Sequence, residues 1–157
     1  MDDNKLITLL DRGGVFYDIP GNTVKDMLNN FIRLIDLPRE LDKDTLLQAV
    51  LERENLMSTG IGNGIALPHP RNPLAEKPEN QSISIGFPKT AIDWKALDGK
   101  PVNTVILIVS ASPKLHLHTL SRVSFLCRQE PFLQLLQDRS SAEILKKAIQ
   151  EAEAAWN

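Results

Sequence analysis

The sequence has 157 residues, a net charge of −2 at pH 7 and a single cysteine. Its apolar fraction of 42% and charged fraction of 24% are typical of a soluble globular protein, and its length suffices for one domain with a buried core. The mild negative charge argues against nucleic-acid binding, which requires a basic surface. A lone Cys127 excludes an internal disulfide and a cysteine-based zinc cluster.

No apolar run approaches the length needed to span a bilayer, and the polar, acidic residues 1–5 do not resemble a signal peptide. No internal repeat, low-complexity tract or linker divides the chain. We therefore expect one cytoplasmic domain over residues 1–157, with no direct membrane insertion.

Hydrophobic periodicity predicts the secondary structure. The expected elements, in chain order, are a strand over 15–19, a helix over 24–35, a helix around 46–51, brief and longer strands over 65–67, 83–87 and 102–109, and helices over 113–126, 132–136 and 140–155. Alternation over 83–87 predicts one buried face, whereas the continuous apolar run 102–109 predicts burial on both faces. Thr23 and Ser140 each begin a pattern that resembles a helix capping box. This grouping predicts an α+β fold, a three-layer α/β/α sandwich in which helices cover both faces of a mixed β-sheet.

A glycine-rich run, Ser58-Thr59-Gly60-Ile61-Gly62-Asn63-Gly64, separates the second helix from the brief strand. Its spacing matches neither the dinucleotide-binding pattern nor the P-loop, so nucleotide binding is not expected. A plain turn is one interpretation. The other is an anion-binding loop, because small residues let backbone N–H groups approach a phosphate.

Three histidines are candidates for chemistry. His69 lies between two prolines just after the glycine run, which favours a rigidly held nucleophile over a structural histidine. His116 lies near the start of a helix that follows the central strand, where active-site crevices form in such sheets. His118 points to another face of that helix and is expected to be exposed or capping, so a zinc site shared by the three is disfavoured.

Arg53 ends the second helix, just before the glycine run. The Arg53-Glu54 pair reads either as a solvated helix terminus or as an arginine placed to neutralise a phosphoryl group, to which its planar fork is suited.

These residues together resemble a known family. The run from Arg53-Glu54 through Ser58-Thr59-Gly60-Ile61-Gly62-x-Gly64-Ile65-Ala66-Leu67-Pro68-His69 is similar to the active-site motif of enzyme IIA domains of the phosphoenolpyruvate-dependent phosphotransferase system, in the fructose/mannitol and nitrogen-regulatory branch. Ile92-Asp93-Trp94 to Val102 and His116-Leu117 to Val123 resemble two further stretches of that family. The resemblance covers essentially the whole chain in order.

The resemblance implies a phosphoryl carrier. A small histidine phosphocarrier protein would donate the group to His69, flanked by His116 and Arg53. Ser58, Thr59, Gly60, Gly62 and Gly64 would form the phosphate loop. The acceptor would be a regulatory target protein or a IIB component, and no metal or cofactor is implied. The length favours a nitrogen-regulatory role. A sugar-specific IIA role, or a regulatory binding module that carries no phosphate, is the alternative.

One departure from the family pattern follows the candidate nucleophile. Pro70 stands where the family commonly has glycine. Because proline has no N–H, any phosphate contact from that backbone position is absent here, and the loop is expected to be stiffer.

Overall fold

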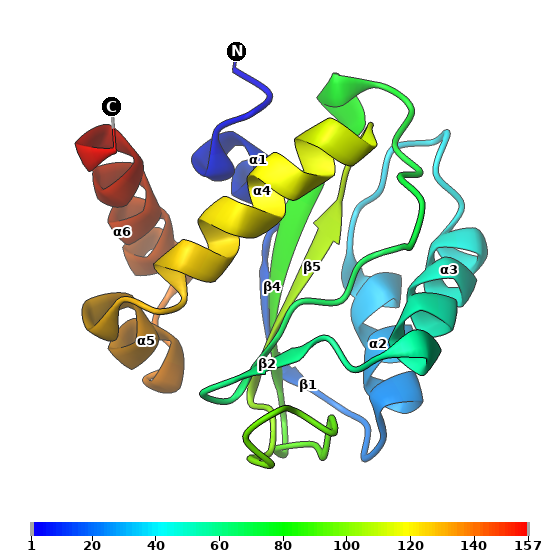
Figure 1. Ribbon diagram of the computed structural model, residues 1–157, viewed down its shortest axis with the longest axis vertical. Coiled ribbons are helices and arrows are strands. Elements are labelled where there is room, and N and C mark those ends of the chain that lie inside the picture. The colour runs from blue at the N-terminus through cyan, green and yellow to red at the C-terminus, as the bar shows by residue number, and fades with distance from the viewer. Residues whose placement is uncertain (1, 157) are drawn as a thin grey trace.

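The computed structural model describes residues 2–156, so the ends of the expected domain, residues 1 and 157, lie outside the described part. Five strands form one mixed sheet in the order β1-β4-β5-β3-β2 (Figure 1). They are β1 (Val15–Ile19), β2 (Gly60–Gly62), β3 (Ile65–Ala66), β4 (Ser82–Pro88) and β5 (Thr104–Val109). The pairs β1–β4 and β3–β5 are parallel, whereas β4–β5 and β2–β3 are antiparallel.

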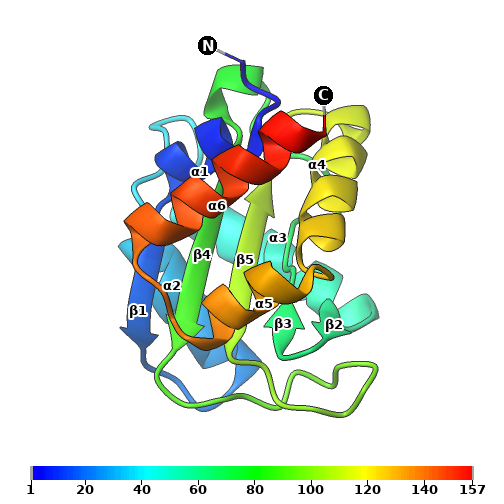
Figure 2. The ribbon, with the colours of Figure 1, turned by 90° about the vertical axis from the view of Figure 1, so that its left-hand side faces the viewer.

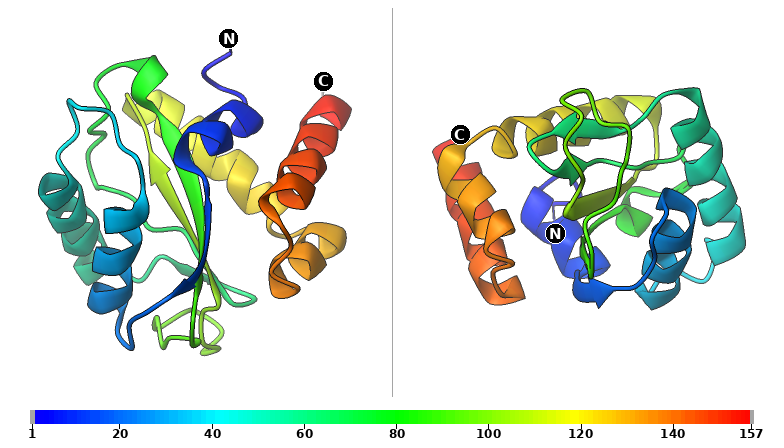
Figure 3. Two further views of the ribbon diagram at one scale, coloured as in Figure 1. Left: turned by 180° about the vertical axis from the view of Figure 1, so that it is seen from behind. Right: turned by 90° about the horizontal axis from the view of Figure 1, so that it is seen from below.

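Helices cover both faces of this sheet (Figure 2, Figure 3). One face carries α2 (Val24–Leu34) and α3 (Lys43–Leu56); the other carries α1 (Leu6–Gly13), α4 (Pro113–Leu126), α5 (Glu130–Gln137) and α6 (Ala142–Ala155). A short 3-10 helix spans Pro78–Asn80. A separate hydrophobic core fills each space between sheet and helices. The expected α+β, three-layer architecture is therefore confirmed. In residues 2–156, no helix has the length and apolar character needed to cross a bilayer.

The two central strands are both buried on both faces. This confirms the prediction for β5, where Ile106 and Leu107 belong to opposite cores. For β4 the prediction of a single buried face is wrong. The cause is the small residue Gly86: a side chain there would place its Cβ 2.8 Å from the Phe31 ring, so α2 packs directly on the strand backbone.

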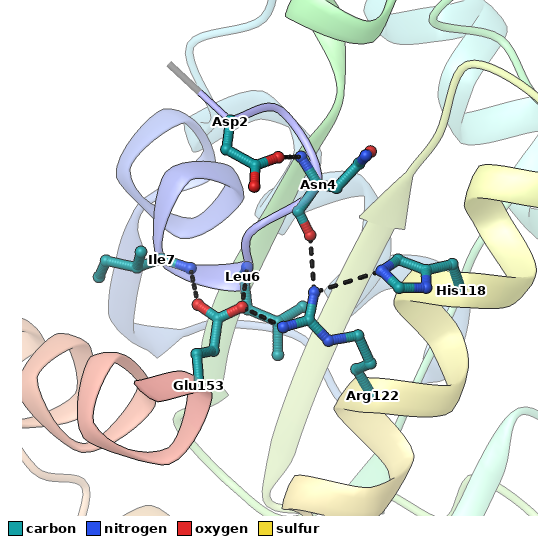
Figure 4. Close-up of polar contacts among 7 residues, drawn as sticks. All are labelled: Asp2, Asn4, Leu6, Ile7, His118, Arg122 and Glu153. Carbon is teal, nitrogen blue, oxygen red and sulfur yellow. Dashed lines mark hydrogen bonds and ion pairs between the residues drawn. The ribbon is translucent and has the colours of Figure 1, made fainter. Parts of the chain in front are cut away.

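Helix α1 was not among the expected elements. Leu6, Leu9 and Leu10 lie on its buried side at helical spacing, which is the signal that the sequence carried. Within the described residues, no neighbouring side chain caps its N-terminus. Instead the carboxylate of Glu153, on α6, accepts hydrogen bonds from the backbone N–H groups of Leu6 at 2.7 Å and Ile7 at 2.9 Å (Figure 4). The helix is thus capped by a residue from the other end of the chain.

Side-chain oxygens cap the N-termini of α2, α3 and α6, and the cap of α6 lies one residue beyond the predicted one. The Thr23 hydroxyl accepts the Asp26 N–H and the Asp42 carboxylate accepts the Thr45 N–H. The cap of α6 is Ser141 rather than Ser140, whose hydroxyl instead donates to the carbonyl of Leu135. Cys127 is buried and caps the C-terminus of α4.

Candidate functional site

Two histidines meet beyond one edge of the sheet. Strand β3 runs parallel to β5, and the chain beyond it stays attached because the Ile108 N–H donates to the Pro68 carbonyl at 3.1 Å. The segment that bears His69 and the start of α4 therefore emerge side by side. The ring centroids of His69 and His116 lie 4.6 Å apart, with 39° between the ring planes. This geometry places His116 beside His69, and a role for either ring in phosphoryl transfer stays a prediction.

The His69 ring is fixed in one tautomer. Its Nδ1 lies 2.8 Å from the Leu67 carbonyl oxygen. Because a carbonyl oxygen only accepts, Nδ1 must carry the proton and Nε2 keeps its lone pair in the neutral ring. The side chain is 9% exposed, and this burial, together with the positive charge of Arg53, lowers the pKa of His69 below its ordinary value. At pH 7 the ring is therefore neutral, as a nucleophile must be.

The His116 ring is also neutral. It is half-buried in the first turn of α4, with Nδ1 3.4 Å from the hydroxyl oxygen of Ser110. Burial, followed by the charges of His69 and Arg53, lowers the pKa of His116 to about 4. A protonated ring is disfavoured there, yet the positive end of the α4 dipole favours an incoming anion at the same place.

Arg53 lies in the last turn of α3, close enough to act electrostatically on both histidines. Its guanidinium donates to the Met57 carbonyl at 2.7 Å, and within residues 2–156 it forms no hydrogen bond to either ring. The structure thus brings together the three residues expected at the site. Arg53 is held near the two rings by its hydrogen bond to Met57, the C-cap residue of α3.

The glycine-rich run forms β2 and the turn of a β-hairpin, which corrects the plain-turn interpretation, whereas anion binding by its backbone N–H groups stays a prediction. Gly60–Gly62 forms β2 and pairs with β3. Small residues are required here because a side chain at Gly60 would place its Cβ 2.8 Å from the Ala96 side chain. The hairpin turn has positive φ at Gly62, Asn63 and Gly64, where the two glycines adopt this conformation without strain.

Several donors of the expected phosphate loop are already engaged. The Ser58 hydroxyl donates to the Trp94 carbonyl at 2.6 Å and accepts the Gly60 N–H at 3.0 Å. The backbone N–H and the hydroxyl of Thr59 both donate to the carboxylate of Glu54. Phosphate binding by Ser58, Thr59, Gly60, Gly62 and Gly64 remains a prediction, and these contacts show that the Thr59 and Gly60 amides would have to exchange partners to serve it.

The third histidine lies elsewhere. His118 is exposed, and its Nε2 lies 3.4 Å from a guanidinium nitrogen of Arg122 (Figure 4). The three histidines therefore do not converge. Across residues 2–156 no group of three histidine, cysteine or acidic side chains is arranged to hold a metal ion.

Sequence reasoning missed two contacts at the site. Ser110 comes directly after β5 and lies next to His116, and Glu54 holds Thr59. The second had a signal in the sequence: an acidic side chain precedes a run of small residues whose backbone N–H groups need acceptors.

Fold and site define an α+β protein with a paired-histidine site at one edge of a mixed sheet. A family model described as "Phosphoenolpyruvate-dependent sugar phosphotransferase system, EIIA 2" matches residues 8–152. The chain therefore belongs to this family of enzyme IIA domains, which are phosphotransferase components.

Relatives come from both branches of the family. A nitrogen regulatory protein of Pseudomonas aeruginosa is 31% identical over 149 residues, covering 92% of this chain and 94% of that protein. The fructose-specific EIIABC component of Bacillus subtilis is 32% identical over 145 residues, which cover 90% of this chain but only 22% of the Bacillus protein. Sequence similarity thus establishes the family without separating the two branches.

Solved structures agree on the fold. The nitrogen regulatory protein IIA-Ntr from Neisseria meningitidis superposes with a TM-score of 0.75 at 23% identity, covering 91% of this chain and 94% of that one. Escherichia coli IIA mannitol, solved in complex with phosphorylated IIB mannitol, superposes with a TM-score of 0.67 at 14% identity, covering 87% and 94%.

Proposed function

We propose that His69 accepts a phosphoryl group on Nε2 from a histidine phosphocarrier protein. The hydrogen bond from Nδ1 of His69 to the Leu67 carbonyl carries this proposal. It leaves the lone pair of a neutral imidazole on Nε2, next to a second neutral imidazole and within the field of Arg53.

The transfer needs only these groups. The Nε2 lone pair attacks phosphorus, a new N–P bond forms, and the N–P bond to the donor imidazole breaks with its electron pair returning to the donor nitrogen. The phosphorylated ring keeps its Nδ1–H bond to Leu67. Arg53 and the positive end of α4 at His116 stabilise the charge spread over the phosphoryl oxygens. The step as written uses no metal or cofactor.

The donor would dock on apolar surface beside the two histidines. Met57, whose carbonyl accepts a hydrogen bond from Arg53, is 69% exposed, and Leu117, next to His116, is 64% exposed. Exposed apolar side chains next to a reactive group are typical of a transient protein interface. The net charge of −2 supports a donor with basic groups around its own histidine.

We infer a nitrogen-regulatory output as the main role, exerted in the cytoplasm by one domain over residues 1–157. Phosphorylation adds nearly two negative charges at the site. This changes which protein surface can dock there. The one cysteine is no second acceptor, because it is 1% exposed and burial raises the pKa of the Cys127 thiol to about 12. The identity to the Bacillus fructose component favours the second candidate, a sugar-specific IIA that passes the group to a IIB component.

The test is reconstitution with phosphoenolpyruvate, enzyme I and a phosphocarrier protein, followed by mapping of the label. An acid-labile phosphate on Nε2 of His69 is expected. Label on another histidine, or none with a cognate donor, would reject the proposal and favour a binding module that carries no phosphate.

The branch is tested by capture of partners with phosphorylated wild type and with His69→Ala, which stays unphosphorylated. Regulatory proteins that differ between the two samples support the signalling role. Recovery of a sugar-specific IIB protein only, with sugar phosphate formed in the reconstituted mixture, assigns the chain to transport.

A further inference from the structure

We infer that the Glu54 carboxylate is a positioning residue that holds His69 in its Nδ1–H tautomer through the backbone of the β2–β3 hairpin. Its consequence for phosphoryl transfer rests on the function proposed above, whereas its consequence for the ring itself does not. A continuous chain of hydrogen bonds runs from Glu54 through Thr59 and Leu67 to the imidazole of His69.

The first link fixes the start of the hairpin. One carboxylate oxygen of Glu54 accepts the Thr59 backbone N–H at 2.6 Å, and the other accepts the Thr59 hydroxyl at 2.5 Å. Hydrogen bonds to an ionised acceptor are among the strong ones, and two to the same residue fix its orientation as well as its position. Thr59 is 6% exposed, so water does not readily replace Glu54 as its partner.

The second link passes this constraint to the histidine. The Thr59 carbonyl accepts the Leu67 N–H at 3.0 Å, and the Leu67 carbonyl accepts the Nδ1–H of His69 at 2.8 Å. Leu67 is fully buried, so its carbonyl has no competing contact with bulk solvent. Displacement of Thr59 therefore moves the atom that selects the tautomer of His69.

A second set of hydrogen bonds attaches the hairpin to β5, so the loss of Glu54 should affect the position of the Leu67 carbonyl and not the fold. The Pro68 carbonyl accepts the Ile108 N–H, and Ile65 and Ala66 pair with β5, so the hairpin stays attached to the sheet without Glu54. Loss of the carboxylate should loosen the Leu67 carbonyl without unfolding the domain.

The location of Glu54 supports a role in the site over a role in the helix. It lies in the last turn of α3, where the negative end of the helix dipole disfavours a carboxylate. A structural helix terminus would favour a basic residue there. The unfavourable position is offset by the two donors of Thr59 across the gap between α3 and β2.

The test measures the ring nitrogens of His69 by 15N NMR on the unphosphorylated full chain, and then the initial rate of phosphoryl transfer. Glu54→Ala should lower the ratio of Nδ1–H to Nε2–H tautomer about fivefold, the effect of one weakened hydrogen bond. It should slow transfer about tenfold, because the attacking lone pair is then present and aligned less often.

Two substitutions serve as rescue variants. Glu54→Gln should restore the tautomer ratio, since its amide oxygen can accept the Thr59 N–H while its amide group donates to the Thr59 hydroxyl oxygen. Thr59→Ser keeps both donors and should keep the wild-type tautomer ratio, whereas Thr59→Val keeps only the backbone donor and should change that ratio less than Glu54→Ala does. Glu52→Ala removes an exposed carboxylate from the same helix and should leave ratio and rate unchanged.

A tautomer ratio that stays at the wild-type value in folded Glu54→Ala and in Thr59→Val overturns the inference. If Glu54→Ala does not fold, Thr59→Val alone decides. Because the tautomer is measured without any donor, failure of wild type to become phosphorylated rejects the proposed function and leaves this result standing by itself.

Discussion

Helix α4 presents two histidines, two residues apart, to two different polar clusters. On one side the His116 ring lies tilted against the His69 ring, and both rings are partly desolvated and neutral. On the other, exposed His118 lies beside Arg122, which is bonded to the buried carboxylate of Glu153 (Figure 4). In the first cluster, Nε2 of His69 keeps its lone pair. In the second cluster both carboxylate oxygens of Glu153 accept hydrogen bonds, and the contacts join α1, α4 and α6.

Helix geometry explains the separation. Two residues correspond to a rotation of about 200° around the axis, so neighbouring histidines on α4 cannot share one environment. In the second cluster, Glu153 is 4% exposed and accepts from Arg122 as well as from the first turn of α1. The Arg122 guanidinium also packs over the Trp156 ring at 5.2 Å. Residue type alone therefore does not assign a role; desolvation and hydrogen-bond partners do.

The largest expected effect separates the two histidines by function. His116→Ala should slow phosphoryl transfer to His69 between about a hundredfold and a thousandfold, because it removes a neutral hydrogen-bonding ring from the place where charge develops. His118→Ala should change the rate less than about twofold, the behaviour of an exposed group outside the site. Rapid-quench kinetics with a labelled donor measures both. A slow His118→Ala beside a normal His116→Ala would contradict the assignment.

The next effect concerns stability. Glu153→Ala should lower the free energy of unfolding by about 3 kcal/mol, because it leaves the Arg122 guanidinium and two amides of α1 without their acceptor. Chemical denaturation measures the change. Glu151→Ala, which removes an exposed carboxylate from the same helix, is the control and should be nearly neutral. The folded fraction of Glu153→Ala should accept a phosphoryl group on His69 at the wild-type rate. A large loss of this rate would show that the Arg122–Glu153 cluster is coupled to the paired histidines.

The acid sensitivity of the fold should come from the paired-histidine side. The folded pKa of His116, about 4, lies below the ordinary value of 6.5, so between these pH values the unfolded chain binds more protons than the folded one. Stability therefore rises with pH through this window and is lost as pH falls. After allowance for the half-exposed ring, the contribution is about 1 kcal/mol.

Denaturation at pH 7 and pH 5 tests this expectation. The drop in unfolding free energy should be smaller for His116→Ala than for wild type, whereas His118→Ala should match wild type. The lowered pKa of His69 acts in the same direction and remains in all three proteins. Equal drops in wild type and His116→Ala would show that burial does not depress the pKa of His116.

The comparison also shows what the sequence could predict. The layers, the central strand β5 and most helices follow from local periodicity, and the resemblance of residues 116–123 to the family favoured His116 over His118 as the second histidine. Burial of the second face of β4 was hidden because it depends on Phe31 packing over Gly86, a contact distant in sequence. The cap of α1 was hidden for the same reason, since Glu153 comes from the far end of the chain. Local patterns predict elements; long-range contacts that satisfy single polar atoms need the fold.

The smallest expected effect is that of ionic strength, which should act on exposed charges more than on the buried Arg122–Glu153 pair. If a basic donor is steered to this acidic protein, the transfer rate at low donor concentration should fall a few-fold as ionic strength rises from about 0.02 M to about 0.5 M. The reason is that the Debye length then becomes shorter than the distance over which the two proteins attract each other. The Arg122–Glu153 pair is mostly shielded from solvent and should be screened far less, so the unfolding free energy should change little over the same range. Both quantities can be measured on one preparation, in sodium chloride. A rate that stays constant would show that the donor docks through apolar contacts at Met57 and Leu117 without charge steering, because burial of apolar surface does not depend on ionic screening.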